Sequence, residues 1–105
     1  MYINNSKEDM KVIVLNVTYR CENGMREAFL DKIKAEGIDL GSRNEEGNIC
    51  YEYFFSTSTS DVLFLLEKWK DAEAVEFHKK QHHFLRLGEL KSEFVEETTI
   101  EKYEV

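Results

Sequence analysis

The chain has 105 residues, which is enough for one domain built around one hydrophobic core. Hydrophobic residues make up 42% of the chain and aromatic residues 12%, so it can bury a core instead of staying disordered. Its 14 basic and 21 acidic residues give a net charge of −7, and a surface of that sign repels phosphate backbones, which disfavours nucleic-acid binding.

The start of the chain is polar and lacks the apolar segment of a signal peptide. We therefore expect residues 1–9 to be a mobile leader and residues 10–105 to form a single domain. The longest apolar run, residues 62–66, is far shorter than the ~20 residues of a membrane span, so no membrane association is expected. Without a secretion signal, Cys21 and Cys50 are expected to be free thiols of a cytoplasmic protein.

The first two predicted elements are a strand and a helix. Residues 11–20 are rich in β-branched side chains, which favours a strand. Asn23 can cap a helix over residues 24–37, and Gly37 and Gly41 are expected to end it. Three hydrophobic residues fall at helical spacing on one face of this segment and are expected in the core: Met25, Phe29 and Ile33.

The second half of the chain contains three predicted strands and one predicted helical segment. Residues 47–58 and 61–70 predict two strands joined by a polar turn. Asp71 suits the N-cap of a helical segment that continues, whole or broken, to about Gly88. Residues 94–105 predict a last, mostly polar strand. The order β-α-β-β-α-β is that of the ferredoxin-like fold, an α+β class with an antiparallel sheet.

The two central strands of this fold are apolar on both faces. Val14 and Leu15 point to opposite sides of the first strand, as Phe64 and Leu65 do in the third. An antiparallel sheet with helices on one face normally has a polar second face. We therefore expect the second face to pack against the sheet of an identical subunit, which predicts a homodimer.

The only tryptophan and all three histidines lie within residues 67–84. Glu67 and Trp69 are two residues apart and share one face of their strand. His78 falls on the inward face of the helix that follows. Asn16 is the one polar residue in the apolar centre of the first strand, and it is expected to approach Glu67 and Trp69 because these strands are neighbours in the fold.

A family resemblance rests on one spaced pattern: Glu67-x-Trp69-x-Asp71-x-x-Ala74-x-x-x-His78, followed by His83-Phe84. This pattern resembles the antibiotic biosynthesis monooxygenase domain, a superfamily of small ferredoxin-like proteins that pair into dimeric α+β barrels. The segment "NEEGNICYEY" (residues 44–53) is similar to that family's acidic residue, glycine and strand tyrosine. The resemblance covers residues 10–103.

The resemblance implies a cofactor-independent monooxygenase that uses O₂ and an electron-rich aromatic substrate such as a quinol or a polycyclic phenol. His78 would accept the substrate proton, and Asn16 would donate a hydrogen bond to the resulting oxyanion. Trp69 would hold the aromatic ring, and Glu67 would orient a partner or tune its pKa. Four residues are expected to line the substrate pocket: Tyr51, Phe77, His83 and Phe84.

Other branches of the superfamily supply alternatives. Members that degrade heme carry a tryptophan on the second helix and a histidine about three turns later; those places fall near His78 and Gly88 here, so heme cleavage is not expected. Another branch isomerises small phosphorylated sugars and would need cationic groups, for which Lys79, Lys80 and Arg86 are the nearby candidates. A non-catalytic dimeric module that binds a small ligand is the third alternative.

Each candidate residue also has a purely structural interpretation. Trp69 can cap the core at a strand end, His78 can be a buried ring satisfied by its neighbours, and Asn16 can be a satisfied interface residue. His78 and His82 are spaced i, i+4, as in metal sites on one helix face, but no third ligand is defined and two lysines lie between them. No metal is therefore expected.

Overall fold

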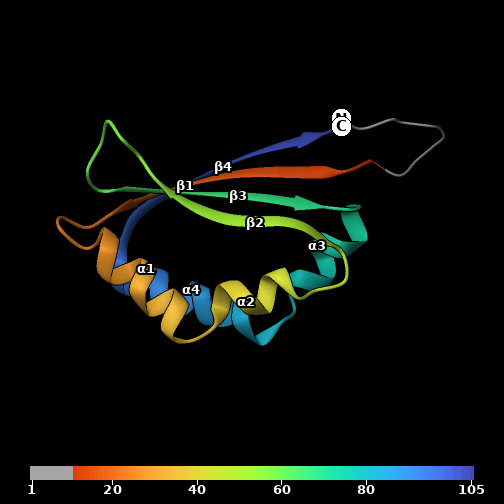
Figure 1. Cartoon of the computed structure of the whole chain (residues 1–105), viewed down its shortest axis with the longest axis horizontal. Coiled ribbons are helices and arrows are strands. Elements are labelled where there is room, and N and C mark those ends of the chain that lie inside the picture. The colour runs from red at the N-terminus through yellow and green to blue at the C-terminus, as the bar shows by residue number, and fades with distance from the viewer. Residues whose placement is uncertain (1–10) are drawn as a thin grey trace.

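The computed structural model describes residues 11–105, so the expected leader and its boundary with the domain lie outside the described residues. In this part of the chain, one antiparallel sheet forms one layer and the helices cover one of its faces (Figure 1). The strands are β1 (Ile13–Cys21), β2 (Asn48–Phe55), β3 (Val62–Trp69) and β4 (Val95–Glu104), in the spatial order β2-β3-β1-β4. The helices are α1 (Arg26–Ala35), α2 (Ile38–Arg43), α3 (Ala72–His78) and α4 (His82–Phe94).

The predicted α+β, ferredoxin-like class is confirmed. The first predicted helix is α1 and is followed by an unpredicted helix, α2, and the second predicted helical segment is the pair α3 and α4. Gly37 separates α1 from α2 with a positive φ of 70°, a conformation that suits glycine. Gly41 lies inside α2, so the prediction that it ends the helix is wrong. The predicted cap by Asn23 is also wrong, because Met25 occupies the N-cap of α1 without a side-chain hydrogen bond.

The second helical segment begins as predicted. The Asp71 carboxylate accepts a hydrogen bond of 2.9 Å from the backbone N–H of Ala74, which caps α3. The segment then breaks over residues 79–81, and α4 continues past Gly88 to Phe94. This break allows α3 and α4 to follow different directions beneath the sheet (Figure 1).

The core lies between the sheet and the helices. Odd-numbered residues of β1 and β3 face the helices, and Val17, Leu63 and Leu65 are buried there against Phe29 and Ile33 of α1. Met25, expected on the same inward stripe as these two α1 residues, is 36% exposed instead.

No helix or strand of residues 11–105 covers the opposite face of the sheet (Figure 1). It carries Val14, Phe64 and Leu66, which are only partly buried, and Phe54, which is exposed and contacts the ring of Phe64. The prediction that both faces of the central strands are apolar is therefore confirmed. No helix within residues 11–105 combines the length and the apolar character needed to cross a membrane.

Candidate active site

A partly open cavity of about 200 Å³ lies between the sheet and the helices α3 and α4. We call it the inner cavity. The residues around it come from four strands and two helices: Val17, Tyr19, Tyr51, Glu67, His78, Phe84, Leu87, Gly88, Lys91, Thr98 and Ile100. Its lining is mostly apolar and aromatic with a few polar groups, which is typical of sites for small organic ligands.

Glu67 and Trp69 lie side by side at the end of β3, as predicted. The indole Nε1–H of Trp69 donates a hydrogen bond of 2.8 Å to the Glu67 carboxylate. Trp69 is fully buried and Glu67 is 7% exposed. Burial disfavours the charged form of the carboxyl group and raises the pKa of Glu67 from its ordinary value of 4.5 to about 7. A carboxyl group of that pKa can exchange protons near neutral pH.

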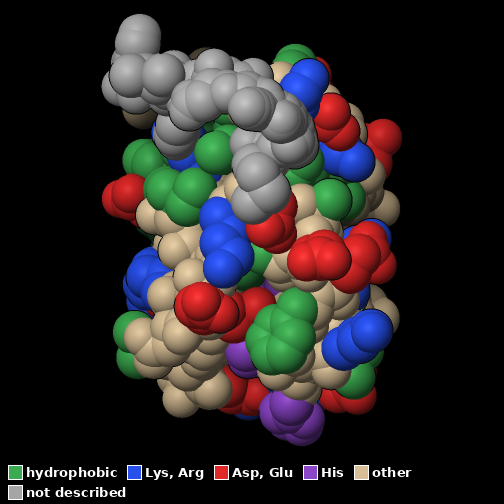
Figure 2. Space-filling view, turned by 90° about the vertical axis from the view of Figure 1, so that its right-hand side faces the viewer, with side chains coloured by type: hydrophobic (Ala, Val, Ile, Leu, Met, Phe, Trp, Pro, Cys, Tyr) green, Lys and Arg blue, Asp and Glu red, His purple; other side chains and the backbone are tan. Residues whose placement is uncertain are grey.

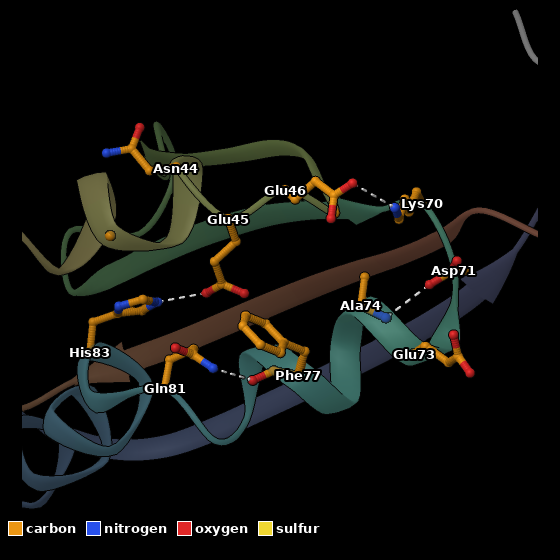
Figure 3. Close-up of a pocket in the computed structure, with 12 residues that line it drawn as sticks. Asn44, Glu45, Glu46, Lys70, Asp71, Glu73, Ala74, Phe77, Gln81 and His83 are labelled. Atoms are coloured by element: carbon orange, nitrogen blue, oxygen red, sulfur yellow. Dashed lines mark hydrogen bonds and ion pairs between the residues drawn. The ribbon is translucent and has the colours of Figure 1, made fainter.

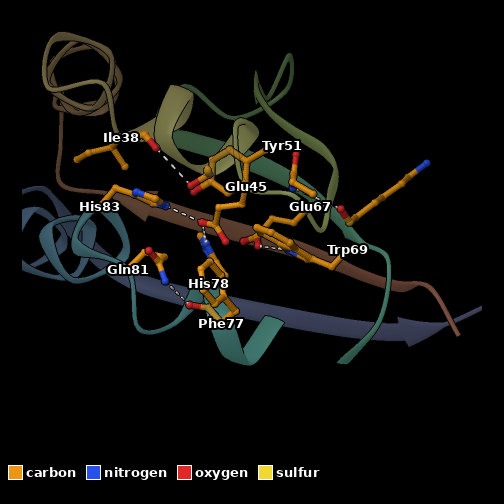
Figure 4. A network of polar contacts seen from close by, with 12 residues as sticks. Ile38, Glu45, Tyr51, Glu67, Trp69, Phe77, His78, Gln81 and His83 are labelled. Carbon is orange, nitrogen blue, oxygen red and sulfur yellow. Dashed lines mark hydrogen bonds and ion pairs between the residues drawn. The ribbon is translucent and has the colours of Figure 1, made fainter. Parts of the chain in front are cut away.

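His78 is buried and connects this pair to a second carboxylate. Its ring lies against Trp69, with 4.5 Å between the ring centroids, and it also contacts the rings of Tyr51 and Phe84. Its Nδ1 lies 2.7 Å from Oε2 of Glu45 (Figure 4). Burial lowers the pKa of His78, and Glu45 opposes that shift. The imidazole is therefore kept mainly neutral at physiological pH, as a proton acceptor must be.

Glu45 was not singled out in the sequence. It follows α2 and points between two rings, since the same Oε2 also lies 2.6 Å from Nε2 of His83 (Figures 3 and 4). These three side chains offer ligand atoms within 4.8 Å of one another, which is the one set in residues 11–105 with spacing suited to a metal ion. The only sequence signal was the acidic residue of the "NEEG" segment.

Glu45 and His83 line a second, more open hollow of about 560 Å³, which we call the outer cleft. Phe77 and Gln81 form its lower wall in Figure 3. Acidic side chains surround it, and Figure 2 shows histidines lying beside acidic and hydrophobic side chains at one end of the molecule. His78 belongs to the inner cavity, so its contact with Glu45 joins the two hollows.

Asn16 is not part of this arrangement. It is paired with Leu66 across the β1–β3 ladder, and both side chains point to the open face of the sheet. Glu67 and Trp69 point to the helical face. The predicted approach of Asn16 to these two residues is therefore wrong, because adjacent strand residues alternate between faces.

The four expected pocket residues divide between the two hollows. Tyr51 and Phe84 line the inner cavity. Phe77 is 56% exposed and lines the outer cleft instead of the inner cavity. His83 also lies at the outer cleft, where it contacts Glu45.

One cation of the inner cavity was missed in the sequence. Lys91 lies on α4 with its ammonium 5.6 Å from the centroid of the Tyr19 ring, and partial burial lowers its pKa. Of the three cations considered for a phosphate site, Arg86 contacts Glu36 and Glu89, Lys79 contacts Glu76, and Lys80 is exposed. Of the cations in residues 11–105, Lys91 is the one that lines the inner cavity.

Comparison with known proteins places this arrangement in a family. The sequence model described as antibiotic biosynthesis monooxygenase matches residues 12–90. The chain is 37% identical over 73 residues to "Putative monooxygenase YcnE" of Bacillus subtilis (strain 168), covering 70% of this chain and 75% of that protein.

Solved structures agree on the fold. A conserved protein from Bacteroides thetaiotaomicron VPI-5482, titled a possible oxidoreductase, superposes with a TM-score of 0.82 at 32% identity, covering 92% of this chain and all of that one. The structure of a "Putative antibiotic biosynthesis monooxygenase from Nitrosomonas europaea" superposes with a TM-score of 0.82 at 19% identity and covers 95% of both chains. At that identity, the similarity shows the fold alone.

Proposed function

Because the chain belongs to the antibiotic biosynthesis monooxygenase family, we propose that it is a cofactor-independent monooxygenase that acts on a quinol-like or phenolic aromatic molecule. The observation that carries the proposal is the position of His78, a buried imidazole packed against Trp69 at the wall of a largely apolar cavity. A proton acceptor next to an aromatic surface suits a substrate that must become an anion before it can reduce O₂.

The net reaction balances without an external reductant. A phenol and O₂ give a quinone and water, so the substrate supplies both the electrons and the hydrogens. Nε2 of His78 takes the hydroxyl proton, and the electron pair of the O–H bond stays on the substrate oxygen. The anion reduces O₂ and combines with it at a ring carbon that carries a hydrogen. When the O–O bond of the resulting peroxide breaks, that carbon loses its hydrogen as a proton and becomes the second carbonyl, and the departing oxygen takes this proton. The proton held by His78 returns to that departing oxygen.

The remaining groups of the inner cavity have supporting roles. Lys91 takes over the function first expected of Asn16, because its ammonium can stabilise the substrate oxyanion in a poorly hydrated site. Trp69 is fully buried behind His78, so it holds the imidazole rather than the substrate directly. The rings of Tyr51 and Phe84 remain candidates for contact with the aromatic substrate.

Oxygen uptake tests the proposal. Reduced quinols and phenols are supplied to the wild type, to His78→Ala and to His82→Ala, whose side chain is exposed on the neighbouring helix. We expect protein-dependent uptake that His78→Ala lowers by about 10²-fold or more and that His82→Ala retains. Circular dichroism and light scattering establish that each variant is folded and of unchanged size. Equal uptake by His78→Ala and the wild type would remove His78 from the mechanism.

We further propose that the protein acts as a homodimer in the cytoplasm. The uncovered sheet face with Val14, Phe54, Phe64 and Leu66 supports the dimer, because a second copy would remove that apolar surface from water. Both cysteines are free, which suits a reducing compartment.

A further inference from the structure

The carboxylate of Glu45 lies at the boundary between the inner cavity and the outer cleft, and one of its oxygens contacts two imidazole rings. Oε2 lies 2.7 Å from Nδ1 of His78 and 2.6 Å from Nε2 of His83. The Glu45 side chain is only 6% exposed, and its other oxygen, Oε1, is buried without a hydrogen-bond partner in the described part of the chain. A carboxylate held this deeply requires strong partners, and the two rings supply them.

The contact fixes where the ring protons are. A carboxylate oxygen only accepts hydrogen bonds, so Nδ1 of His78 and Nε2 of His83 both carry a proton. When neutral, His78 must then have its lone pair on Nε2. Within residues 11–105, Nε2 has no hydrogen-bond partner, and the His78 ring lines the inner cavity. The tautomer set by Glu45 is thus the one that leaves a proton acceptor free on the cavity side.

Hydrogen bonding explains this cluster better than metal binding does. A histidine that binds a metal through one nitrogen usually donates its second N–H to a carboxylate or a carbonyl group. Neither Nε2 of His78 nor Nδ1 of His83 has such a partner in residues 11–105. The distances of 2.6 and 2.7 Å are those of charge-assisted hydrogen bonds.

We propose that Glu45 is a positioning residue, whose carboxylate holds His78 in the tautomer that presents Nε2 to the inner cavity and stabilises the imidazolium formed there. The role in turnover rests on the proposed function; the tautomer does not. His83 supports the carboxylate from the outer cleft, and it fits there because Gly41 has no side chain: a Cβ at that position would lie 2.6 Å from Nδ1 of His83.

Several ionisable groups besides Glu45 lie near His78. His83 of α4 lowers the pKa of His78, and Lys91 of α4, Tyr51 of β2 and Glu67 of β3 line the same cavity. Glu45 raises the pKa of His78 both by its hydrogen bond and by its charge. Neutralising Glu45 alone is therefore expected to lower that pKa further.

The decisive experiment compares the wild type, Glu45→Gln and Glu46→Gln by NMR of the histidine ring nitrogens across a pH titration. Glu46 is a matched control, because it is the next residue, lines the same outer cleft and has a side chain that is 91% exposed. We expect a protonated Nδ1 and an unprotonated Nε2 for neutral His78 in the wild type and in Glu46→Gln. In Glu45→Gln, we expect a mixture of tautomers and a lower pKa of His78.

A wild-type His78 protonated on Nε2 would overturn the proposal, and this result does not depend on whether Glu45→Gln folds. The proposal would also be overturned if one equivalent of Zn²⁺ bound to the wild type and displaced the ring protons of His78 and His83. Where a substrate is found, Glu45→Gln should lose about 10²-fold in kcat with little change in KM. Absence of oxygen uptake by the wild type would instead count against the proposed function, and the ring-nitrogen spectra would still decide the role of Glu45.

Discussion

Glu67 shows how one buried residue can make stability depend on pH. Its carboxyl group is hydrogen-bonded to Trp69 but is otherwise held in a low-polarity part of the inner cavity, and its pKa is raised to about 7. The folded state therefore favours the protonated form. The contribution of Glu67 to the free energy of unfolding is fully present below the ordinary pKa of 4.5, and it is lost as the pH rises through about 7.

Glu67→Gln should remove this dependence, because glutamine can accept the same hydrogen bond from Trp69 without a charge. Between pH 5 and pH 8 we expect the free energy of unfolding of the wild type to fall by about 2–3 kcal/mol relative to that of Glu67→Gln. Urea unfolding at both pH values measures it. Parallel pH profiles for the two proteins would show that Glu67 is not protonated in the folded state.

At the scale of elements, the packing of α2 against α4 depends on a position without a side chain. Gly41 of α2 lies against His83 of α4, and a Cβ there would be 2.6 Å from Nδ1 of the ring. Gly88 of α4 has no atom within 4 Å of the corresponding position. A side chain at position 41 would therefore clash with a neighbouring helix, whereas a side chain at position 88 would have free space.

Gly41→Ala is expected to destabilise the protein by about 1–3 kcal/mol, because the His83 ring must move and its contact with Glu45 weakens. Gly88→Ala should stabilise it by about 0.5–1 kcal/mol, because alanine loses less backbone entropy in a helix. Thermal and urea unfolding of both variants provide the comparison. If Gly41→Ala were as stable as Gly88→Ala, the close approach of the two helices would be refuted.

The short helix α3 depends on its N-cap. It has seven residues, and the Asp71 carboxylate accepts the hydrogen bond from the Ala74 N–H. Asp71→Ala should lower the free energy of unfolding by about 1 kcal/mol, whereas Asp71→Asn should keep most of the stabilisation that the cap provides. Urea unfolding measures both variants. An equal loss in both would mean that the charge of Asp71, not the cap, matters.

In the part of the chain that the structure describes, helices cover one face of the sheet and leave the other open. With helices on one side only, the apolar side chains of the other side remain in contact with water in a single chain (Figure 1). The proposed dimer follows from this asymmetry, because association with a second copy is the simplest way to bury the open face.

Leu66→Glu places a charge in the middle of that face and should convert the dimer into a monomer. Glu73→Gln changes an exposed residue of α3, which lies on the helical side of the sheet, and should leave the dimer intact. Light scattering coupled to size-exclusion chromatography measures the mass of each. A monomeric wild type at micromolar concentrations, or a dimeric Leu66→Glu variant, would contradict the proposed interface.

Most of the fold could be predicted because its signals are local. Strand alternation, the Asp71 cap and the spacing of Phe29 and Ile33 each depend on residues a few positions apart. Asn16 was misplaced for a physical reason: its side depends on the register between β1 and β3, and a slip of one residue would move it to the other face. The sequence does not encode that register in any short pattern.

The site was predicted only in part, because its polar contacts are long-range. Glu67, Trp69 and His78 lie close together in the sequence, and their proximity could be anticipated. Glu45 lies 33 residues from His78 and 38 from His83, in the segment after a helix that had not been predicted. Only the packing of that helix brings the carboxylate of Glu45 to the rings of His78 and His83.

The contact between Trp69 and His78 also gives the molecule a built-in fluorescent reporter. Trp69 is the only tryptophan of the chain, so all indole fluorescence arises from one fully buried ring that touches the imidazole and is hydrogen-bonded to Glu67. A protonated imidazole quenches a neighbouring indole, and an ionised carboxylate alters its emission energy. The intensity and colour of this emission should therefore follow the charge of the two groups as pH changes or as a ligand enters, without any attached dye.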